Sequence, residues 1–101
     1  MQTTVRDWYV IKVLDGETLV GQLLWGFVID SDRFSAGDYV CTSMIDEIKE
    51  QHIITAKGSY YVVEGTGKTF EAYLSEVDLL RKGYSPDQIT RLRSHFSKDL
   101  Q

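Results

Sequence analysis

The chain has 101 residues, of which 43% are hydrophobic and 26% are charged, and its formal net charge is −4. A chain of this length can bury one ordinary hydrophobic core but not two, so we expect a single domain over residues 1–101. The single cysteine, Cys41, excludes an internal disulfide, and no apolar stretch is long enough for a signal peptide or a membrane span, which predicts a cytoplasmic protein without membrane contact.

The acidic residues are concentrated in the first half of the chain. Residues 1–50 hold nine acidic and four basic residues (4 − 9 = −5), whereas residues 51–101 hold six acidic and seven basic ones (7 − 6 = +1). Because an acidic surface repels phosphate, this balance counts against nucleic-acid binding and favours a basic protein partner. The alternative is that the charge only keeps the domain soluble.

The N-terminal third is rich in β-forming residues. Two apolar runs, Trp8–Leu14 and Leu19–Ile29, flank the tight-turn signal Asp15–Gly16 and predict a pair of strands. Gly21 and Gly26 within the second run indicate bulges or bends of a coiled sheet.

The middle third predicts a loop and three more strands. Residues 31–38 are polar and predict a loop anchored by an inward-facing Phe34. A half-buried strand is predicted over Tyr39–Ile48, and a hairpin over His52–Ala56 and Ser59–Glu64, joined at Lys57–Gly58.

A glycine-rich segment separates that hairpin from a short edge strand predicted at Thr69–Tyr73. The glycine-rich segment contains a Gly-Lys-Thr triplet, residues 67–69, like the one in a phosphate-binding P-loop. The upstream glycine and the following helix of that motif are both missing, so we interpret residues 65–67 as a hairpin turn.

The last part of the chain, residues 74–101, predicts a pair of helices packed on the β-rich residues 1–73. The first helix is predicted over about 76–82, with Ser75 as its N-cap and Gly83 at its end. The second begins at Pro86, with Ser85 as N-cap and Gln88 completing the capping box.

The second helix is predicted to be amphipathic. The apolar stripe that should dock on the sheet consists of Ile89, Leu92 and Phe96, and the basic side chains that should face water are Arg91, Arg93 and Lys98. Together these elements predict an α+β fold: a strongly bent antiparallel sheet, or an SH3-like small β-barrel, of about five strands with two short C-terminal helices. A two-layer sandwich is the alternative.

Little in the sequence predicts catalysis or metal binding. Cys41, His52 and His95 lack the spacing of zinc ligands, and the three aspartates of residues 30–38 do not match a calcium loop. We therefore predict no metal, no cofactor and no enzymatic activity, with Cys41 a buried and inert thiol. Convergence of Cys41, His52 and an acid around an open pocket would contradict this prediction.

Residues 34–43 carry the pattern F-x-x-G-D-(Y/W)-V-x-T-S, which is followed by a strand pair and by the G-x-G of residues 65–67. In these features residues 25–83 resemble a family of small uncharacterised bacterial and phage proteins. The resemblance implies no catalytic residues. It implies a bacterial or mobile-element setting, in which compact acidic proteins act by occupying the working surface of another protein.

We therefore predict a non-enzymatic protein-binding factor of a bacterium or phage, of the inhibitor, immunity or anti-defence type, that docks an acidic and aromatic surface on a basic protein. The residues of that surface are Asp30, Asp32, Arg33, Asp38 and Tyr39. The alternative is a small-barrel module that binds nucleic acid or a small ligand. Its residues are Tyr60, Tyr61, Arg91, Arg93 and Lys98. The sequence gives no oligomeric state.

Overall fold

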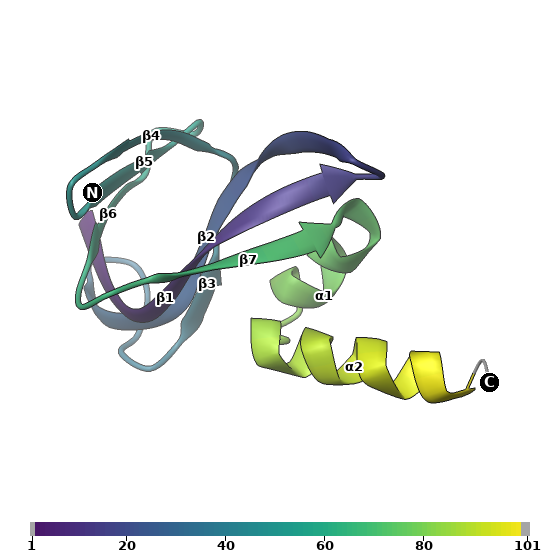
Figure 1. The fold of residues 1–101 in the computed structure, drawn as a ribbon. Coiled ribbons are helices and arrows are strands. Elements are labelled where there is room, and N and C mark those ends of the chain that lie inside the picture. The colour runs from purple at the N-terminus through teal and green to yellow at the C-terminus, as the bar shows by residue number, and fades with distance from the viewer. Residues whose placement is uncertain (1, 100–101) are drawn as a thin grey trace.

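A computed structural model describes the backbone of residues 2–99 and the side chains of residues 2–95. One seven-stranded sheet is followed by a short helical region at the C-terminal end (Figure 1). The strands are β1 (Gln2–Asp15), β2 (Thr18–Ser31), β3 (Tyr39–Cys41), β4 (Ile45–Lys49), β5 (His52–Thr55), β6 (Tyr60–Val63) and β7 (Lys68–Tyr73). The helices are the 3₁₀ turn η1 (Leu74–Glu76), α1 (Val77–Arg81) and α2 (Pro86–Asp99). The α+β prediction is confirmed, but the sheet does not close into a barrel.

β1 is the central strand of the sheet. Along one edge it pairs with β2 in antiparallel fashion, and along the other it pairs in parallel first with β6 and then with β7. The prediction of an antiparallel sheet is therefore wrong: β6 and β7 both run parallel to β1, whereas β2 runs antiparallel to it, so the sheet is mixed. Because β6 and β7 run in the same direction, the residues between them, 65–67, do not form the predicted hairpin turn.

The indole of Trp8 fills the gap between β6 and β7. Asp7 has a positive φ of 48°, and the register between β1 and β2 shifts between Arg6 and Tyr9, as it does at a β-bulge. The Trp8 indole N–H donates to the carbonyl oxygens of Glu64 and Gly65, at 3.1 and 3.3 Å. A Cβ atom on Gly67 would lie 2.4 Å from the indole ring, so only glycine fits at this crossing.

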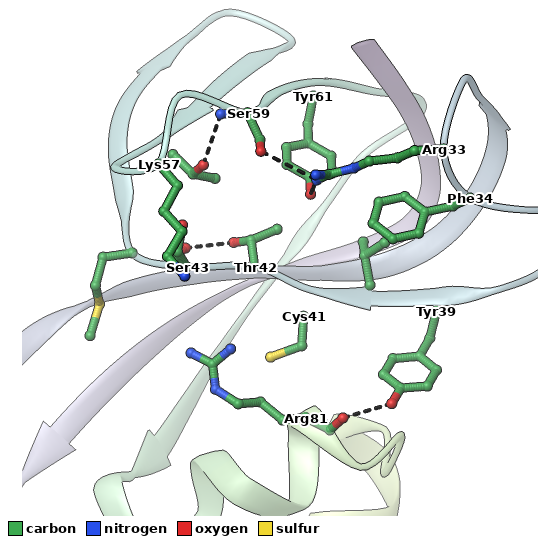
Figure 2. A pocket seen from close by; sticks show the side chains of 13 residues that line it. Arg33, Phe34, Tyr39, Cys41, Thr42, Ser43, Lys57, Ser59, Tyr61 and Arg81 are labelled. Atoms are coloured by element: carbon green, nitrogen blue, oxygen red, sulfur yellow. Dashed lines mark hydrogen bonds between the residues drawn. The ribbon is translucent and has the colours of Figure 1, made fainter. Parts of the chain in front are cut away.

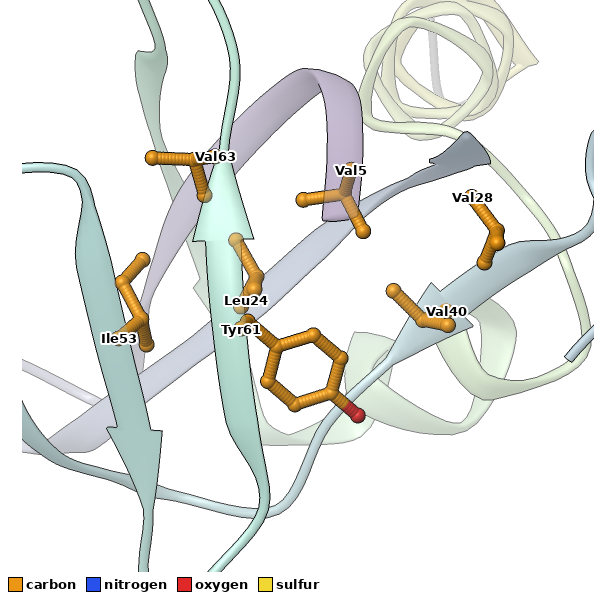
Figure 3. Packing of buried hydrophobic residues seen from close by; sticks show 7 residues of the cluster. All are labelled: Val5, Leu24, Val28, Val40, Ile53, Tyr61 and Val63. Carbon is orange, nitrogen blue, oxygen red and sulfur yellow. The ribbon is translucent and has the colours of Figure 1, made fainter. Parts of the chain in front are cut away.

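The sheet buries side chains on both faces, in two clusters. The first lies between the curled strands β1, β2, β3, β5 and β6 and consists of Val5, Leu24, Val28, Val40, Ile53, Tyr61 and Val63 (Figure 3). The second lies between the sheet and the helices and consists of Ile11, Val13, Leu23, Trp25, Ala72, Leu80 and Ile89. Neighbouring Leu23 and Leu24 belong to different clusters, which explains why β2 is an almost continuous apolar run.

The turn predictions at Gly16 and Gly58 are confirmed, and one strand prediction is wrong. Gly16 and Gly58 adopt positive φ angles in the turns that join β1 to β2 and β5 to β6. The single strand predicted over Tyr39–Ile48 is instead two strands in different places, since β3 pairs with β2 and β4 pairs with β5. The Thr42 hydroxyl oxygen accepts from the Leu24 N–H and donates to the Ser43 carbonyl, and pairing with β2 ends there.

One of the two predicted helix caps is present. The Ser85 hydroxyl accepts from the Gln88 N–H at 3.2 Å, and the Gln88 side chain accepts from the Ser85 N–H at 2.8 Å, as a capping box requires. Ser75 is not an N-cap, because it lies inside η1, where the Glu76 carboxylate accepts from the Tyr73 N–H instead. Within residues 2–99, neither helix has the length and apolar character to cross a membrane.

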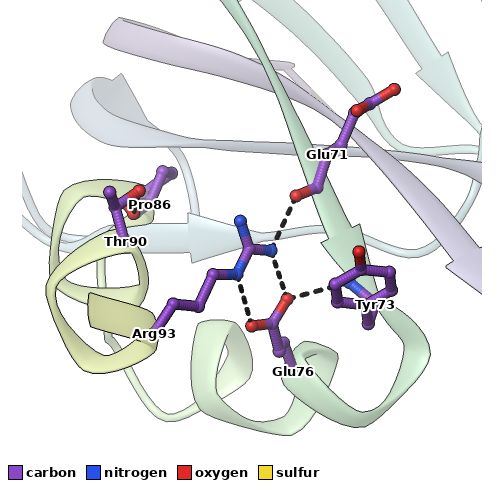
Figure 4. Close-up of polar contacts among 6 residues, drawn as sticks. All are labelled: Glu71, Tyr73, Glu76, Pro86, Thr90 and Arg93. Carbon is purple, nitrogen blue, oxygen red and sulfur yellow. Dashed lines mark hydrogen bonds and ion pairs between the residues drawn. The ribbon is translucent and has the colours of Figure 1, made fainter. Parts of the chain in front are cut away.

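The prediction that Arg93 faces water is wrong, because its guanidinium ties α2 to η1 and β7 (Figure 4). It forms a two-pronged ion pair with Glu76, with a distance of 2.7 Å from Nε to Oε2, and donates to the Glu71 carbonyl at 2.8 Å. The hydrogen bond from Arg93 is the main cause of a lowered pKa of Glu76. Arg91 is exposed as predicted. The side chains of Phe96 and Lys98 lie outside the described residues.

Replacing Gly67 with alanine should lower the free energy of unfolding by about 1–3 kcal/mol, because the new methyl group overlaps the Trp8 ring. Urea denaturation measures this difference. The neighbouring variant Thr66→Ala changes an exposed side chain and should stay within about 0.5 kcal/mol of the parent protein. Equal stabilities of the two variants would contradict the placement of Trp8.

Replacing Glu76 with glutamine should cost on the order of 1 kcal/mol at neutral pH, because it removes a partly exposed ion pair. The pKa of Glu76 is lowered in the folded protein, so this stabilisation is complete above the ordinary glutamate pKa and is lost as the pH falls through the lower, folded-state value. The difference between the two proteins should therefore vanish in acid. Urea denaturation over a pH series tests this, with the exposed Glu17→Gln as control; a difference independent of pH would exclude the ion pair as its source.

Candidate functional site

An open pocket of about 760 Å³ lies along the free side of β3 (Figure 2). We call it the β3 pocket. Its walls are the loop after β2 (33–34), β3 with the link to β4 (39–44), the β5–β6 turn with the strand ends beside it (55, 57, 59, 61), and the C-terminal residue of α1 (81). The lining contains three cationic side chains, Arg33, Lys57 and Arg81, several hydroxyl groups and one thiol, and it contains no carboxylate and no imidazole.

Arg33 is held at one end of the pocket by neutral partners. Its guanidinium donates to the Ser59 hydroxyl at 3.2 Å and to the Tyr61 hydroxyl at 3.1 Å, and lies over the Phe34 ring at 4.5 Å. Phe34 is half-buried against the first core cluster, so the prediction that it turns inward is confirmed. The Ser31 hydroxyl supports this loop by accepting from the N–H groups of Arg33 and Phe34. These contacts orient the guanidinium without neutralising its charge.

Tyr39 positions the other end of the pocket. Its hydroxyl donates to the Arg81 carbonyl at 2.6 Å, and its ring stacks on Trp25 with centroids 6.2 Å apart. Gly83, with a φ of 106°, ends the helical turn directly against the Tyr39 ring. Tyr39 therefore fixes the C-terminal end of α1, from which the Arg81 side chain reaches into the pocket.

Lys57 and Arg81 approach the link between β3 and β4 from opposite walls. Figure 2 shows Lys57 extending from the β5–β6 turn and Arg81 extending from α1, both toward Ser43 and Cys41. Among the described residues, no carboxylate pairs with Lys57, Arg81 or Arg33; the ion pairs there are Arg6–Asp7 and Arg93–Glu76. Three uncompensated cations along one hollow create a positive potential that attracts an anion.

The thiol that lines the pocket belongs to Cys41. Burial raises the pKa of the Cys41 thiol, and the neighbouring Arg81 only partly opposes this effect. A raised pKa leaves less thiolate at neutral pH.

Two of the five residues predicted for an acidic docking surface line the pocket, and three do not. Arg33 and Tyr39 line the β3 pocket. Asp38 caps its own loop by accepting from the Ser35 N–H, and Asp30 and Asp32 are exposed outside the pocket lining. The docking of these residues on a basic protein stays a prediction.

The residues predicted for the alternative nucleic-acid surface do not form one exposed strip. The Tyr61 ring is buried in the first core cluster, and the Tyr60 hydroxyl contacts the His52 ring. Arg93 is engaged with Glu76, whereas Arg91 is exposed on α2. Lys98 lies beyond the described side chains.

The three candidate soft-metal ligands lie on separate elements. Cys41 is on β3, His52 is on β5 and His95 is on α2. In the part of the chain that the structure describes, no three cysteine, histidine or acidic side chains gather in a way that could hold a metal ion.

Sequence reasoning missed Lys57 and Arg81. The sequence predicts Lys57 only as a turn residue and Arg81 only as part of a helix, and neither belongs to a motif that predicts a ligand site. The weak signal available was the excess of basic residues after position 51, which the overall charge of −4 obscures.

The pH midpoint for alkylation of Cys41 by iodoacetamide should lie above that of an ordinary cysteine, because burial raises its pKa. The midpoint should rise further in Arg81→Gln, which removes the cation that opposes the shift. Mass spectrometry of the alkylated fraction over a pH series measures both values. Lys82→Gln, which removes the neighbouring cation outside the pocket, should leave the midpoint unchanged; an Arg81→Gln midpoint equal to that of the parent would mean that Arg81 does not face the thiol.

Comparison with known proteins gives one match. Residues 27–79, which include every wall of the β3 pocket except Arg81, match the family model described as "Domain of unknown function (DUF6957)". Neither the curated proteins nor the solved structures contain a match to the chain. The matched segment lies within the residues that resemble an uncharacterised family and covers more than half of the sequence. The chain therefore belongs to the DUF6957 family.

Proposed function

We propose that this protein is a binding module that holds an anionic ligand in the β3 pocket. The observation that carries the proposal is the composition of the lining: three cations and no acid, in a chain whose net charge is −4. The chain holds 15 acidic and 11 basic residues, so a pocket lined by three cations and no acid departs from its average composition. A bound anion supplies one, because it removes the mutual repulsion of the three cations.

The arrangement of the lining also suits recognition of an anion. The Arg33 guanidinium is held by two hydroxyls and an aromatic ring, so little rotamer entropy is lost when it binds. Hydroxyl groups of the lining, such as that of Ser43, can donate further hydrogen bonds to anionic oxygens. The absence of a base from the lining supports binding rather than catalysis.

Docking on a basic protein stays a second candidate function. A groove of about 420 Å³ between β2 and β4 brings the exposed apolar side chains of Val20 and Ile48 together with Asp46 and Glu47. Apolar contact area beside acidic groups favours a basic partner. A basic peptide that shifts the amide signals of residues 19–22 and 45–48, with no anion bound at the β3 pocket, would favour this candidate over the first.

The anion proposal is tested by titrating ¹⁵N-labelled protein with pyrophosphate and with citrate at low ionic strength. The amide signals of residues 33–34, 41–44 and 57–61 should shift with a common saturation curve. Affinity should fall about tenfold in Lys57→Gln and in Arg81→Gln, because each substitution removes one charge–charge contact worth about 1.4 kcal/mol.

Matched controls exist for both substitutions. Lys49→Gln removes an exposed lysine from β4, and Lys82→Gln removes the cation next to Arg81; neither residue lines the pocket, so both variants should bind like the parent protein. Shifts spread over all basic residues, or equal affinity in all four variants, would reject the proposal.

A further inference from the structure

β3 is a terminal strand with an open edge. Among the described strands it pairs only with β2. The residues on either side of β3 bond to β2: the Val28 N–H donates to the Asp38 carbonyl, and the Thr42 N–H donates to the Leu24 carbonyl. Val40, midway between them, therefore also turns its backbone groups toward β2. Because alternate residues of an antiparallel strand point their backbone groups to the same side, the N–H and C=O groups of Tyr39 and Cys41 point away from β2. Within residues 2–99 no backbone group bonds to them.

This open edge forms one wall of the β3 pocket. Tyr39 and Cys41 both line it, and no other strand covers them (Figure 2). An unpaired edge is a template for one more strand, and β-strand addition is a common mode of peptide recognition. The same hollow therefore offers both backbone hydrogen-bonding groups and positive charge.

The cations lie on both faces of the sheet at this edge. Val40 belongs to the first core cluster, the same one as Tyr61, whose hydroxyl contacts Arg33. Cys41 packs against the second cluster, on the side of α1 and Arg81. Because side chains of a strand alternate between faces, an added strand would direct successive side chains toward Arg33 on one face and Arg81 on the other.

We infer that the anionic ligand of the β3 pocket is an acidic stretch of a partner protein, bound in extended form as an added strand on β3. This inference rests on the proposed function. The segment that this edge would recognise is a run of consecutive aspartate or glutamate residues, since cationic side chains lie on both faces of the sheet. Pairing of two β3 edges from two copies of this chain does not fit, because it would bring six cations together, 2 × 3 from the two pockets.

The experiment compares blocked synthetic peptides with citrate on the same ¹⁵N-labelled, full-length protein. Hexaglutamate should bind more tightly than citrate, and hexaglutamine should not bind. Methylation of alternate backbone nitrogens of hexaglutamate keeps its charge but removes strand hydrogen bonds, and should weaken binding about tenfold. Hydrogen exchange of the Tyr39 and Cys41 amides should slow when hexaglutamate binds, because their N–H groups gain acceptors.

The possible results distinguish the failure of strand addition on β3 from the failure of anion binding in the β3 pocket. If citrate binds at the pocket while the methylated and unmethylated peptides bind equally, or while exchange at Tyr39 and Cys41 is unchanged, strand addition is overturned and anion binding stands. If neither citrate nor hexaglutamate binds, both are overturned. Arg81→Gln should weaken hexaglutamate binding and Lys82→Gln should not; the reverse result would place the peptide elsewhere.

Discussion

The contact between the Trp8 indole and the β6–β7 connection determines the shape of the sheet. β1 pairs with β6 and then with β7 along the same edge, so the chain between those strands must detour at the point where β1 bulges. The indole occupies that point, with its N–H bonded to two carbonyls and its ring against Gly67. The bulge lets one half of β1 face the first core cluster and the other half face the second. The β5–β6 turn lies beside the link between β3 and β4, since Ile45 pairs with Thr55 and the Ala56 N–H donates to the Met44 carbonyl, and Lys57 therefore lines the same pocket as Arg81.

Arg93 and the two arginines of the β3 pocket have different environments. The first stabilises the fold, and the other two are available to bind a ligand. Arg93 is matched by the Glu76 carboxylate and by a backbone carbonyl, and its contacts join three elements of the fold. Arg33 has only neutral hydroxyls and an aromatic ring as partners, and Arg81 approaches a thiol. An ion pair formed within the protein satisfies its own charge. A cation without a carboxylate partner keeps its charge available to a group outside the chain, and three such cations, among the described residues, line the β3 pocket.

Local chemistry made part of this structure predictable from the sequence. The turns at Gly16 and Gly58, the cap formed by Ser85 and Gln88, and the helix end at Gly83 all depend on residues within a few positions of each other. The parallel pairing of β1 with β6 and β7 was not predictable, because no local pattern identifies a distant partner strand. The site divides in the same way. The sequence predicts Arg33, in the polar loop of residues 31–38, and Tyr39, directly after it, as binding residues, whereas no local pattern marks Lys57 or Arg81, which only the folded chain brings to the same pocket.

The place of β1 in the sheet also bears on how the chain folds during synthesis. Of the seven described strands, β1 is synthesised first and is central in the sheet, and its edge at Gln2 is paired only once Tyr60 has been synthesised. Until then β1 can pair only along its other edge, with β2 through a local turn, and this hairpin has apolar side chains for two unfinished cores. The nascent chain therefore passes through a stage in which one long strand edge is unpaired and prone to aggregation. The charged residues Arg6, Asp7 and Lys12 lie along that edge, and charge within an exposed strand is a recognised protection against aggregation.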